Sequence, residues 1–343
     1  MSRSCMVCGG FIQDDHSFIR HESSGKPCCT WRNVPTTQRF PSSVAYSALG
    51  TTWFCLGALP AARQHLEAGI VRYTSDQRRA PVFRMGYDPG VGCRAYASRT
   101  LWLLGYPDQA LARLHDALTL AHELSHPYSL AFAQWWSAFV YKLRRDVPAV
   151  HDQAEATLTL STEQGFTLWM AVGTIFRGWA LAMQGQGEEG VAQVRQGVTA
   201  WRATGATLHV PFLCTLLAEV SDRLDHPEDG LQALAEAHTL VEQYEERYWE
   251  AEISRLRGVL LLRQPRTPQA EAEACFQQAL DVARRQQAKS LELRAAMSLA
   301  RLWQQQSKRT AAYDLLAPIY GWFTEGFDTA DLQEAEALLD ELL

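Results

Sequence analysis

A spacing of about 40 residues recurs along the chain and restricts its fold more than any other feature. Seven small residues are separated by 48, 40, 40, 40, 40 and 42 positions. A second series follows each of them by 12 residues, or by 14 in the sixth unit. Paired small residues at a fixed separation predict helical hairpins, because larger side chains would hold two closely crossing helices apart. The two series are Gly50, Ser98, Ala138, Gly178, Ala218, Gly258 and Ala300, and Ala62, Ala110, Val150, Gly190, Gly230, Ala272 and Ala312.

Turn residues stand between the two helices of the units, where a hairpin requires them. Residues 57–60 contain Gly and Pro, as do residues 105–108, and Pro or Gly recurs in residues 145–148, 185–188 and 225–228. Glycine ends a helix readily, and proline favours the first turn of the next helix. The turns therefore repeat with the same period as the small residues.

The first unit resembles a tetratricopeptide repeat, which carries an aromatic residue, Leu-Gly, a second aromatic, Ala and a bulky residue. The corresponding residues are Tyr46, Leu49, Gly50, Trp53, Ala62 and Leu66. We therefore expect an all-α, tetratricopeptide-like superhelix, or solenoid, of about seven hairpins over residues 42–343. Residues 328–343 should form a capping helix at its C-terminal end. Residues 1–41 lack the repeat, and we expect a disordered N-terminal segment there.

Four further segments resemble the C-terminal tetratricopeptide region of large bacterial signalling proteins, with LuxR-like ATP-dependent regulators related in layout. The segments are residues 83–91, 101–110, 177–182 and 249–258. In that family a nucleotide cyclase or kinase and a signal-transduction ATPase precede the repeats. The resemblance implies a non-catalytic scaffold or sensor in signal transduction, whose protein or peptide partner is a cyclase, such as an adenylate cyclase, a kinase or an ATPase. A small effector is the alternative ligand.

The composition limits the other classes of partner. The net charge of −6 and pI of 5.9 oppose binding to nucleic acid. No stretch approaches the ~20 apolar residues of a membrane span, so we expect no membrane contact and a cytoplasmic location. Gly25 and Lys26 are followed by Pro27, which is not a phosphate-binding loop, and we expect no cofactor.

Two groups of residues raise the possibility of a bound metal. His122, Glu123 and His126 match the spacing of a zinc protease, although Pro127 favours a helix end at this point. A zinc-dependent protein is therefore a second alternative to a binding module. The other group has the sequence C-x2-C-x7-H-x4-H, for which we favour a disordered leader with reactive thiols over a small zinc site. Its residues are Cys5, Cys8, His16 and His21.

The candidate ligand residues lie on the first helix of each hairpin, because this helix lines the concave side of such solenoids. They are Trp169, Arg177, Glu219, Glu252 and Arg255. The alternative is an ordinary solvated helix face. Burial of Arg177 or Glu252 would favour a small-molecule sensor over an extended peptide groove. We expect most of the 11 Trp side chains and Cys55, Cys93, Cys214 and Cys275 to belong to the core.

Overall fold

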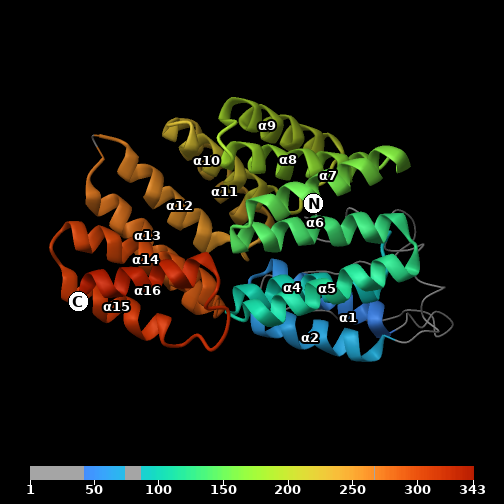
Figure 1. The fold of residues 1–343 in the computed structure, drawn as a ribbon, viewed down its shortest axis with the longest axis horizontal. Coiled ribbons are helices and arrows are strands. Elements are labelled where there is room, and N and C mark those ends of the chain that lie inside the picture. Colours follow the sequence, from blue (N-terminus) through green and yellow to red (C-terminus); the bar gives the residue numbers. More distant parts are fainter. Residues whose placement is uncertain (1–41, 74–85, 266) are drawn as a thin grey trace, which may run out of the picture.

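The computed structural model describes residues 42–73, 86–265 and 267–343, and these residues form helices and connecting turns without a strand (Figure 1). The candidate zinc ligands of the N-terminal segment lie outside the described residues. Seven hairpins and a final helix follow one another, as the repeat predicted. Their helices are α1 (Ser42–Cys55), α2 (Leu59–Arg72), α4 (Pro89–Leu103), α5 (Pro107–Leu124), α6 (Pro127–Arg144), α7 (Val147–Gln164), α8 (Thr167–Met183), α9 (Gly187–Ala203), α10 (Val210–Arg223), α11 (Pro227–Tyr244), α12 (Glu250–Arg263), α13 (Gln269–Gln286), α14 (Lys289–Gln305), α15 (Arg309–Tyr320) and α16 (Ala330–Leu342).

The paired small residues lie where the two helices of a hairpin cross. A Cβ atom on Gly178 would come within 2.7 Å of the Gly190 carbonyl oxygen, and one on Gly190 within 2.6 Å of the Gly178 carbonyl oxygen. In the second hairpin the Ser98 hydroxyl donates to the Ala110 carbonyl oxygen over 2.7 Å. The backbones are therefore too close for larger side chains, which confirms the packing that the spacing predicted.

The helix ends use the local signals of the sequence. Asp88 caps α4, since its Oδ1 accepts hydrogen bonds from the N–H groups of Gly90 and Val91 over 2.8 and 3.1 Å. Gly105 follows α4 with a φ of 93°, a backbone conformation that side chains with a Cβ rarely adopt. Asp88 and Gly105 thus determine where α4 begins and ends, and hence the direction in which the chain continues into α5.

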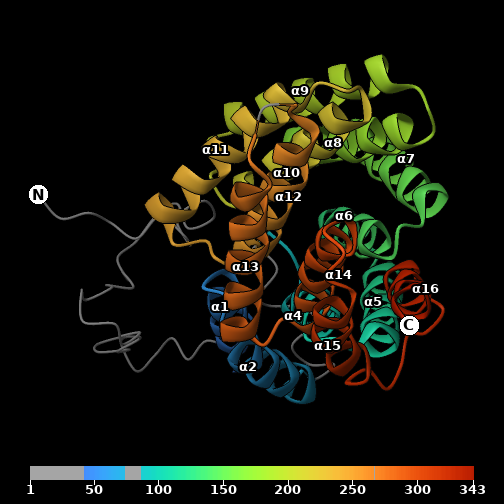
Figure 2. The same ribbon diagram turned by 90° about the vertical axis from the view of Figure 1, so that its left-hand side faces the viewer.

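The superhelix curves until its two ends meet. The first helix of each hairpin lies on the inside and the second on the outside, and Figure 2 shows the C-terminal hairpins returning to the N-terminal ones. The Ser290 hydroxyl of α14 donates to the Trp102 carbonyl oxygen of α4 over 2.5 Å. The backbone N–H of Arg247 donates to the Cys55 carbonyl oxygen over 2.7 Å. The concave side is therefore enclosed by the chain's own ends.

Aromatic side chains fill much of the enclosed inner face. Most of the Trp side chains singled out in the sequence belong to the core, as predicted, while Trp322 is 37% exposed. The four described cysteines are buried, also as predicted. Among the described residues, no helix is long and apolar enough to cross a membrane. The buried tryptophans are Trp102, Trp135, Trp136, Trp169, Trp179, Trp201 and Trp249.

Candidate binding pocket

A cavity of about 380 Å³ opens on the inner face between α6, α8, α10, α12 and α14. One part of its wall is apolar, with Trp179, Met183 and Leu256 among its residues. The other part carries five cationic and three acidic side chains. These charged residues are Lys142, Arg145, Arg223, Arg255, Arg294, Glu219, Asp222 and Glu252.

Glu219 links three helices at one side of this pocket. Its Oε1 lies 2.6 Å from the Nζ of Lys142 on α6, and its Oε2 accepts a hydrogen bond of 2.7 Å from the indole N–H of Trp179 on α8. The Lys142 side chain is 3% exposed, and its Nζ lies 5.6 Å from the centre of the Trp249 ring. Both carboxylate oxygens are thus held in place, and the buried ammonium group has an acid and an aromatic face beside it.

Glu252 is the most deeply buried acid of the pocket, with 1% of its surface exposed. Arg255 holds both of its oxygens, with Nε to Oε2 at 2.8 Å and Nη2 to Oε1 at 2.7 Å. The Nη1 of Arg294 on α14 lies 3.3 Å from Oε1. Burial alone would raise the pKa of Glu252, but Arg255, Arg294 and Lys142 together bring it well below its ordinary range. Glu252 therefore stays charged at neutral pH.

Arg294 connects the pocket to the last helix. Its Nε donates to Asp331 Oδ2 on α16 over 2.6 Å, and its Nη2 donates to the Leu143 carbonyl oxygen over 3.0 Å. Burial opposes its charge, but Asp331 and Glu252 raise the pKa of Arg294 above its ordinary value. Arg145, which directly follows α6, reaches the same Asp331 at 2.7 Å. The predicted capping helix α16 thus closes the end of the array and also completes the charge network.

The structure brings together three of the five candidate ligand residues, Glu219, Glu252 and Arg255. Arg177 lies elsewhere, because its Nε donates to Gln193 on α9 over 2.8 Å and its Nη1 lies 3.4 Å from Glu155 on α7. It immediately precedes the small residue of its repeat and points toward the outer helices. Glu219 immediately follows the small residue of its own repeat and points inward.

Trp169 does not stack on Arg177. It is 2% exposed and lies in the aromatic core, with its ring centre 5.3 Å from that of Trp135 and 5.2 Å from that of Tyr128. Trp169 and Arg177 therefore do not contribute to one ligand site, because the two side chains face different layers of the solenoid.

Sequence reasoning missed Lys142, Arg223 and Arg294 in the pocket. The position of Arg294 within its repeat could have indicated that its side chain is buried. Arg294 and Glu252 each lie six residues before the small residue of their repeat, where the preceding repeat has Phe212. A charged residue at a register position that is otherwise apolar indicates a buried ionic contact. Neither residue alone reveals that the two side chains meet.

His122, Glu123 and His126 do not form the zinc-protease arrangement. Helix α5 ends at Leu124, and Ser125 has a left-handed backbone with φ of 50°. His126 then caps α6, where its Nδ1 accepts a hydrogen bond of 3.2 Å from the Ser129 N–H. The two histidines therefore lie on different helices. Within the described residues, no three or more His, Cys, Asp or Glu side chains are grouped so that they could hold a metal ion.

A second buried cation, Arg99 of α4, lies in an entirely different setting. It is fully buried, and its guanidinium carbon lies 3.1 Å from the ring centre of Trp136, 4.2 Å from that of Tyr96 and 4.3 Å from that of Phe54. None of its three nitrogens makes a hydrogen bond with the described part of the chain. Burial lowers the pKa of Arg99. We call Arg99 and these rings the aromatic enclosure.

Comparison with known proteins supports the fold. No family model matches the chain. Uncharacterized protein R02095 of Rhizobium meliloti (strain 1021) is 25% identical over 252 residues, which are 73% of this chain and 24% of that protein. The chain therefore spans about a quarter of the length of this curated relative.

Solved structures of Rap proteins share the helical solenoid. A Rap protein complexed with Competence and Sporulation Factor has a TM-score of 0.57 at 13% identity, over 88% of this chain and 80% of that one. The apo form of RapI has a TM-score of 0.51 at 9% identity, over 87% and 99% of the two chains. Aspartyl phosphate phosphatase F from Bacillus subtilis has 0.52 at 9% identity, over 81% and 69%. At these identities the likeness shows the fold alone, which is the tetratricopeptide-like solenoid that the sequence predicted.

Proposed function

We propose that this chain is a non-catalytic binding module whose inner-face pocket takes an acidic group of a protein or peptide partner. The observation that carries this proposal is the excess of cationic over acidic side chains in the pocket wall, five against three. An anion entering the pocket would be attracted electrostatically by this positive excess.

Arg223 is the cation best placed to receive the acidic group. Among the described residues it makes no ion pair, whereas Lys142, Arg145, Arg255 and Arg294 each have an acid at bonding distance. It is also exposed and stands at the C-terminal end of α10. The paired cations hold the pocket in shape, and Arg223 is left to bind.

The apolar part of the pocket wall determines which residue of the partner fits beside its acidic group. Trp179, Met183 and Leu256 offer an apolar surface beside the cations, and the cavity of about 380 Å³ accommodates one or two side chains. A short segment with an acidic residue next to an apolar one fits both parts of the wall. A long helix does not fit, because the ends of the superhelix close the inner face.

A small-molecule sensor is the second candidate, and the burial of Glu252 favours it. A fully buried, charged glutamate held by two arginines is typical of a preformed small pocket. In such a sensor, an anionic effector would tighten contacts between α10, α12 and α14 and so stiffen the solenoid.

The signalling role is also part of the proposal. The curated relative is about four times the length of the segment that it shares with this chain. We propose that such segments act in the bacterial cytoplasm beside a cyclase, kinase or ATPase part, and pass a binding event to it. The resemblance of the repeat segments to such signalling proteins supports this context.

A peptide-display selection against the full chain tests the binding module. We expect the selected peptides to share an acidic residue next to an apolar one. Arg223→Gln should weaken the selected peptides by about tenfold or more, which corresponds to ~1.4 kcal/mol. Arg257→Gln is the matched control, since Arg257 is an exposed arginine on α12 outside the pocket wall, and it should leave affinity unchanged.

Two results would contradict the proposal. One is a selection whose peptides carry no acidic residue. The other is an equal loss of affinity in the Arg223→Gln and Arg257→Gln proteins, which would mean that only the general surface charge is sensed. A selection without binders, together with a small acidic metabolite that binds the wild type and not Arg223→Gln, would support the sensor instead.

A further inference from the structure

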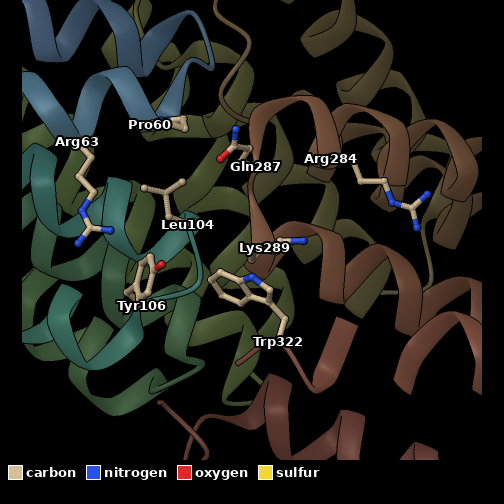
Figure 3. A pocket seen from close by; sticks show the side chains of 8 residues that line it. All are labelled: Pro60, Arg63, Leu104, Tyr106, Arg284, Gln287, Lys289 and Trp322. Carbon is tan, nitrogen blue, oxygen red and sulfur yellow. The ribbon is translucent and has the colours of Figure 1, made fainter. Parts of the chain in front are cut away.

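A second cavity, of about 450 Å³, lies at the seam where the two ends of the superhelix meet (Figure 3). Its wall combines Pro60 and Arg63 of α2 and Tyr106 before α5 with Arg284, Lys289 and Trp322 from the C-terminal hairpins. The pocket that carries the proposed function is formed by other residues.

The wall of the seam cavity is positively charged. Arg63, Arg284 and Lys289 supply three cations, and the lining contains no acidic residue among the described residues. Glu292 lies behind the wall, where it is 4% exposed and pairs with Arg284 at 3.0 Å and with Lys289 at 2.7 Å. One buried acid thus faces two of the three cations, and a positive excess remains for a ligand.

Three helices begin beside the cavity, and each adds partial positive charge. In the part of the chain that the structure describes, no side chain caps α2 or α14. At the start of α5, the N–H groups of Asp108 and Gln109 donate to Glu325 Oε1 over 2.9 and 3.1 Å. Glu325 therefore already neutralises the start of α5, and the starts of α2 and α14 are the two left to favour an anion in the cavity.

Aromatic rings supply the other part of the wall. The ring centres of Tyr106 and Trp322 lie 5.6 Å apart, and Figure 3 shows both rings at the cavity, with Arg63 next to Tyr106, Lys289 next to Trp322, and Arg284 directed away from the rings. Arg63 lies 4.8 Å from the Tyr106 ring centre, and the Nζ of Lys289 lies 5.5 Å from that of Trp322. With 37% of its surface exposed, Trp322 leaves part of a flat apolar ring free for stacking.

We propose that the seam cavity binds a small phosphorylated molecule with a flat ring, of about the size of a mononucleotide. The phosphate would pair with Arg63 and Lys289, with Arg284 adding charge at the rim, and the ring would stack on Trp322. The doubly charged phosphate suits several separate cations better than a single carboxylate does. The cavity volume is within the usual range for small-molecule sites.

Binding at this site would also hold the superhelix closed. Arg63 and Tyr106 belong to the N-terminal hairpins, whereas Lys289 and Trp322 belong to the C-terminal ones. A ligand that contacts both groups binds the closed form better than any form in which the ends have separated, and so shifts the population toward closure.

Calorimetric titration of the full chain with AMP, GMP, CMP and UMP tests the ligand class, with the four nucleosides and inorganic phosphate as comparisons. We expect saturable binding of at least one nucleotide with a Kd below about 1 mM. The matching nucleoside and phosphate alone should bind at least about tenfold more weakly, because each lacks half of the contacts. If none of the four nucleotides saturates, or if the nucleoside binds equally well, the proposal is overturned.

Variants then place the ligand. Arg63→Gln and Trp322→Ala should each weaken nucleotide binding by about tenfold or more. Arg72→Gln is the matched control, because Arg72 lies on the same helix and 4.8 Å from the ring centre of Tyr46, as Arg63 does from Tyr106. Its affinity should equal that of the wild type. Circular dichroism melting confirms that the variants fold, and equal losses in Arg63→Gln and Arg72→Gln would overturn the assignment to the seam.

Discussion

Two buried arginines on the inner face, Arg99 and Arg294, have very different surroundings within the same solenoid. Arg294 has two acids and a backbone carbonyl oxygen for its guanidinium group, and its pKa is raised. Arg99 has aromatic faces on several sides and no hydrogen bond to the described residues, and its pKa is lowered by burial. Both arginines are on first helices, yet one is part of an ionic network and the other is not.

The two surroundings offset the free-energy cost of a buried charge in different ways. Removing water from a guanidinium group costs several kcal/mol, and paired acids with good geometry offset much of that cost. Aromatic faces offset part of that cost, about 2 kcal/mol or more for each favourable contact without water. We infer that the network around Glu252 is intolerant of single changes because every member needs the others. The aromatic enclosure should tolerate loss of its cation, since no acid is then left unpaired.

The largest effect is expected from Arg294→Met. The substitution keeps an apolar stem of similar length but leaves Asp331 without its partner on α14 and Glu252 with fewer cations. Breaking a buried pair in this way costs about 3 to 5 kcal/mol. Urea unfolding measures the free energy, with Arg301→Met as the matched control on the same helix. Arg301 pairs with Glu334 on α16 at 2.8 Å, but its side chain is 46% exposed, so its loss should cost less than about 1 kcal/mol.

An intermediate effect, with a pH signature, is expected from Glu252→Gln. Because the folded-state pKa of Glu252 lies below its ordinary value of 4.5, its charge stabilises the native state above that value. This contribution is lost as the pH falls through the folded-state pKa. We expect the wild type to be more stable than Glu252→Gln at pH 7, and the difference to shrink below about pH 4.5.

Unfolding free energies at a series of pH values provide the measurement. Glu334→Gln is the control, since its carboxylate pairs with arginines at the surface of α16 and is 39% exposed. The pH-dependent difference should be small in that protein. A Glu252→Gln protein whose stability runs parallel to that of the wild type from neutral to acid pH would show that Glu252 is not held charged by its arginines.

The smallest effect is expected from Arg99→Met. The unpaired charge disappears, the contacts between the cation and the rings disappear with it, and an apolar side chain of similar length fills the enclosure. These gains and losses should nearly cancel, leaving stability within about 1 kcal/mol of the wild type. The same urea titration checks this. A loss of 3 kcal/mol or more would place Arg99 in the same class as Arg294 and remove the contrast between the two regions.

Much of the fold could be predicted from local sequence signals. The spacing of Gly178 and Gly190 predicts a close crossing, because the physical requirement for a small side chain is local to one hairpin. Asp88 and Pro89 likewise predict a helix start. The meeting of α4 with α14 could not be predicted, because it depends on the small rotation added by each of several hairpins. The enclosed inner face and the seam cavity result from these accumulated rotations.

The candidate pocket was predictable in part for a related reason. Glu219, Glu252 and Arg255 are polar residues on first helices, so their sequence positions alone brought them into consideration. Arg177 is on a first helix as well, but it precedes its small residue by one position and faces outward. The partnership of Glu252 with Arg294 joins residues 42 positions apart, and only the stacking of α12 on α14 brings them together.

The most direct test of the binding module uses one selected peptide in two forms, with its acidic residue intact and with that residue replaced by the matching amide. Their affinities for the full chain are measured by calorimetry at the same salt concentration. We predict that the amide form binds about tenfold or more weakly to the wild type, and that this difference largely disappears in the Arg223→Gln protein. Equal affinity of both forms for the wild type would contradict recognition of an acidic group by the inner-face pocket.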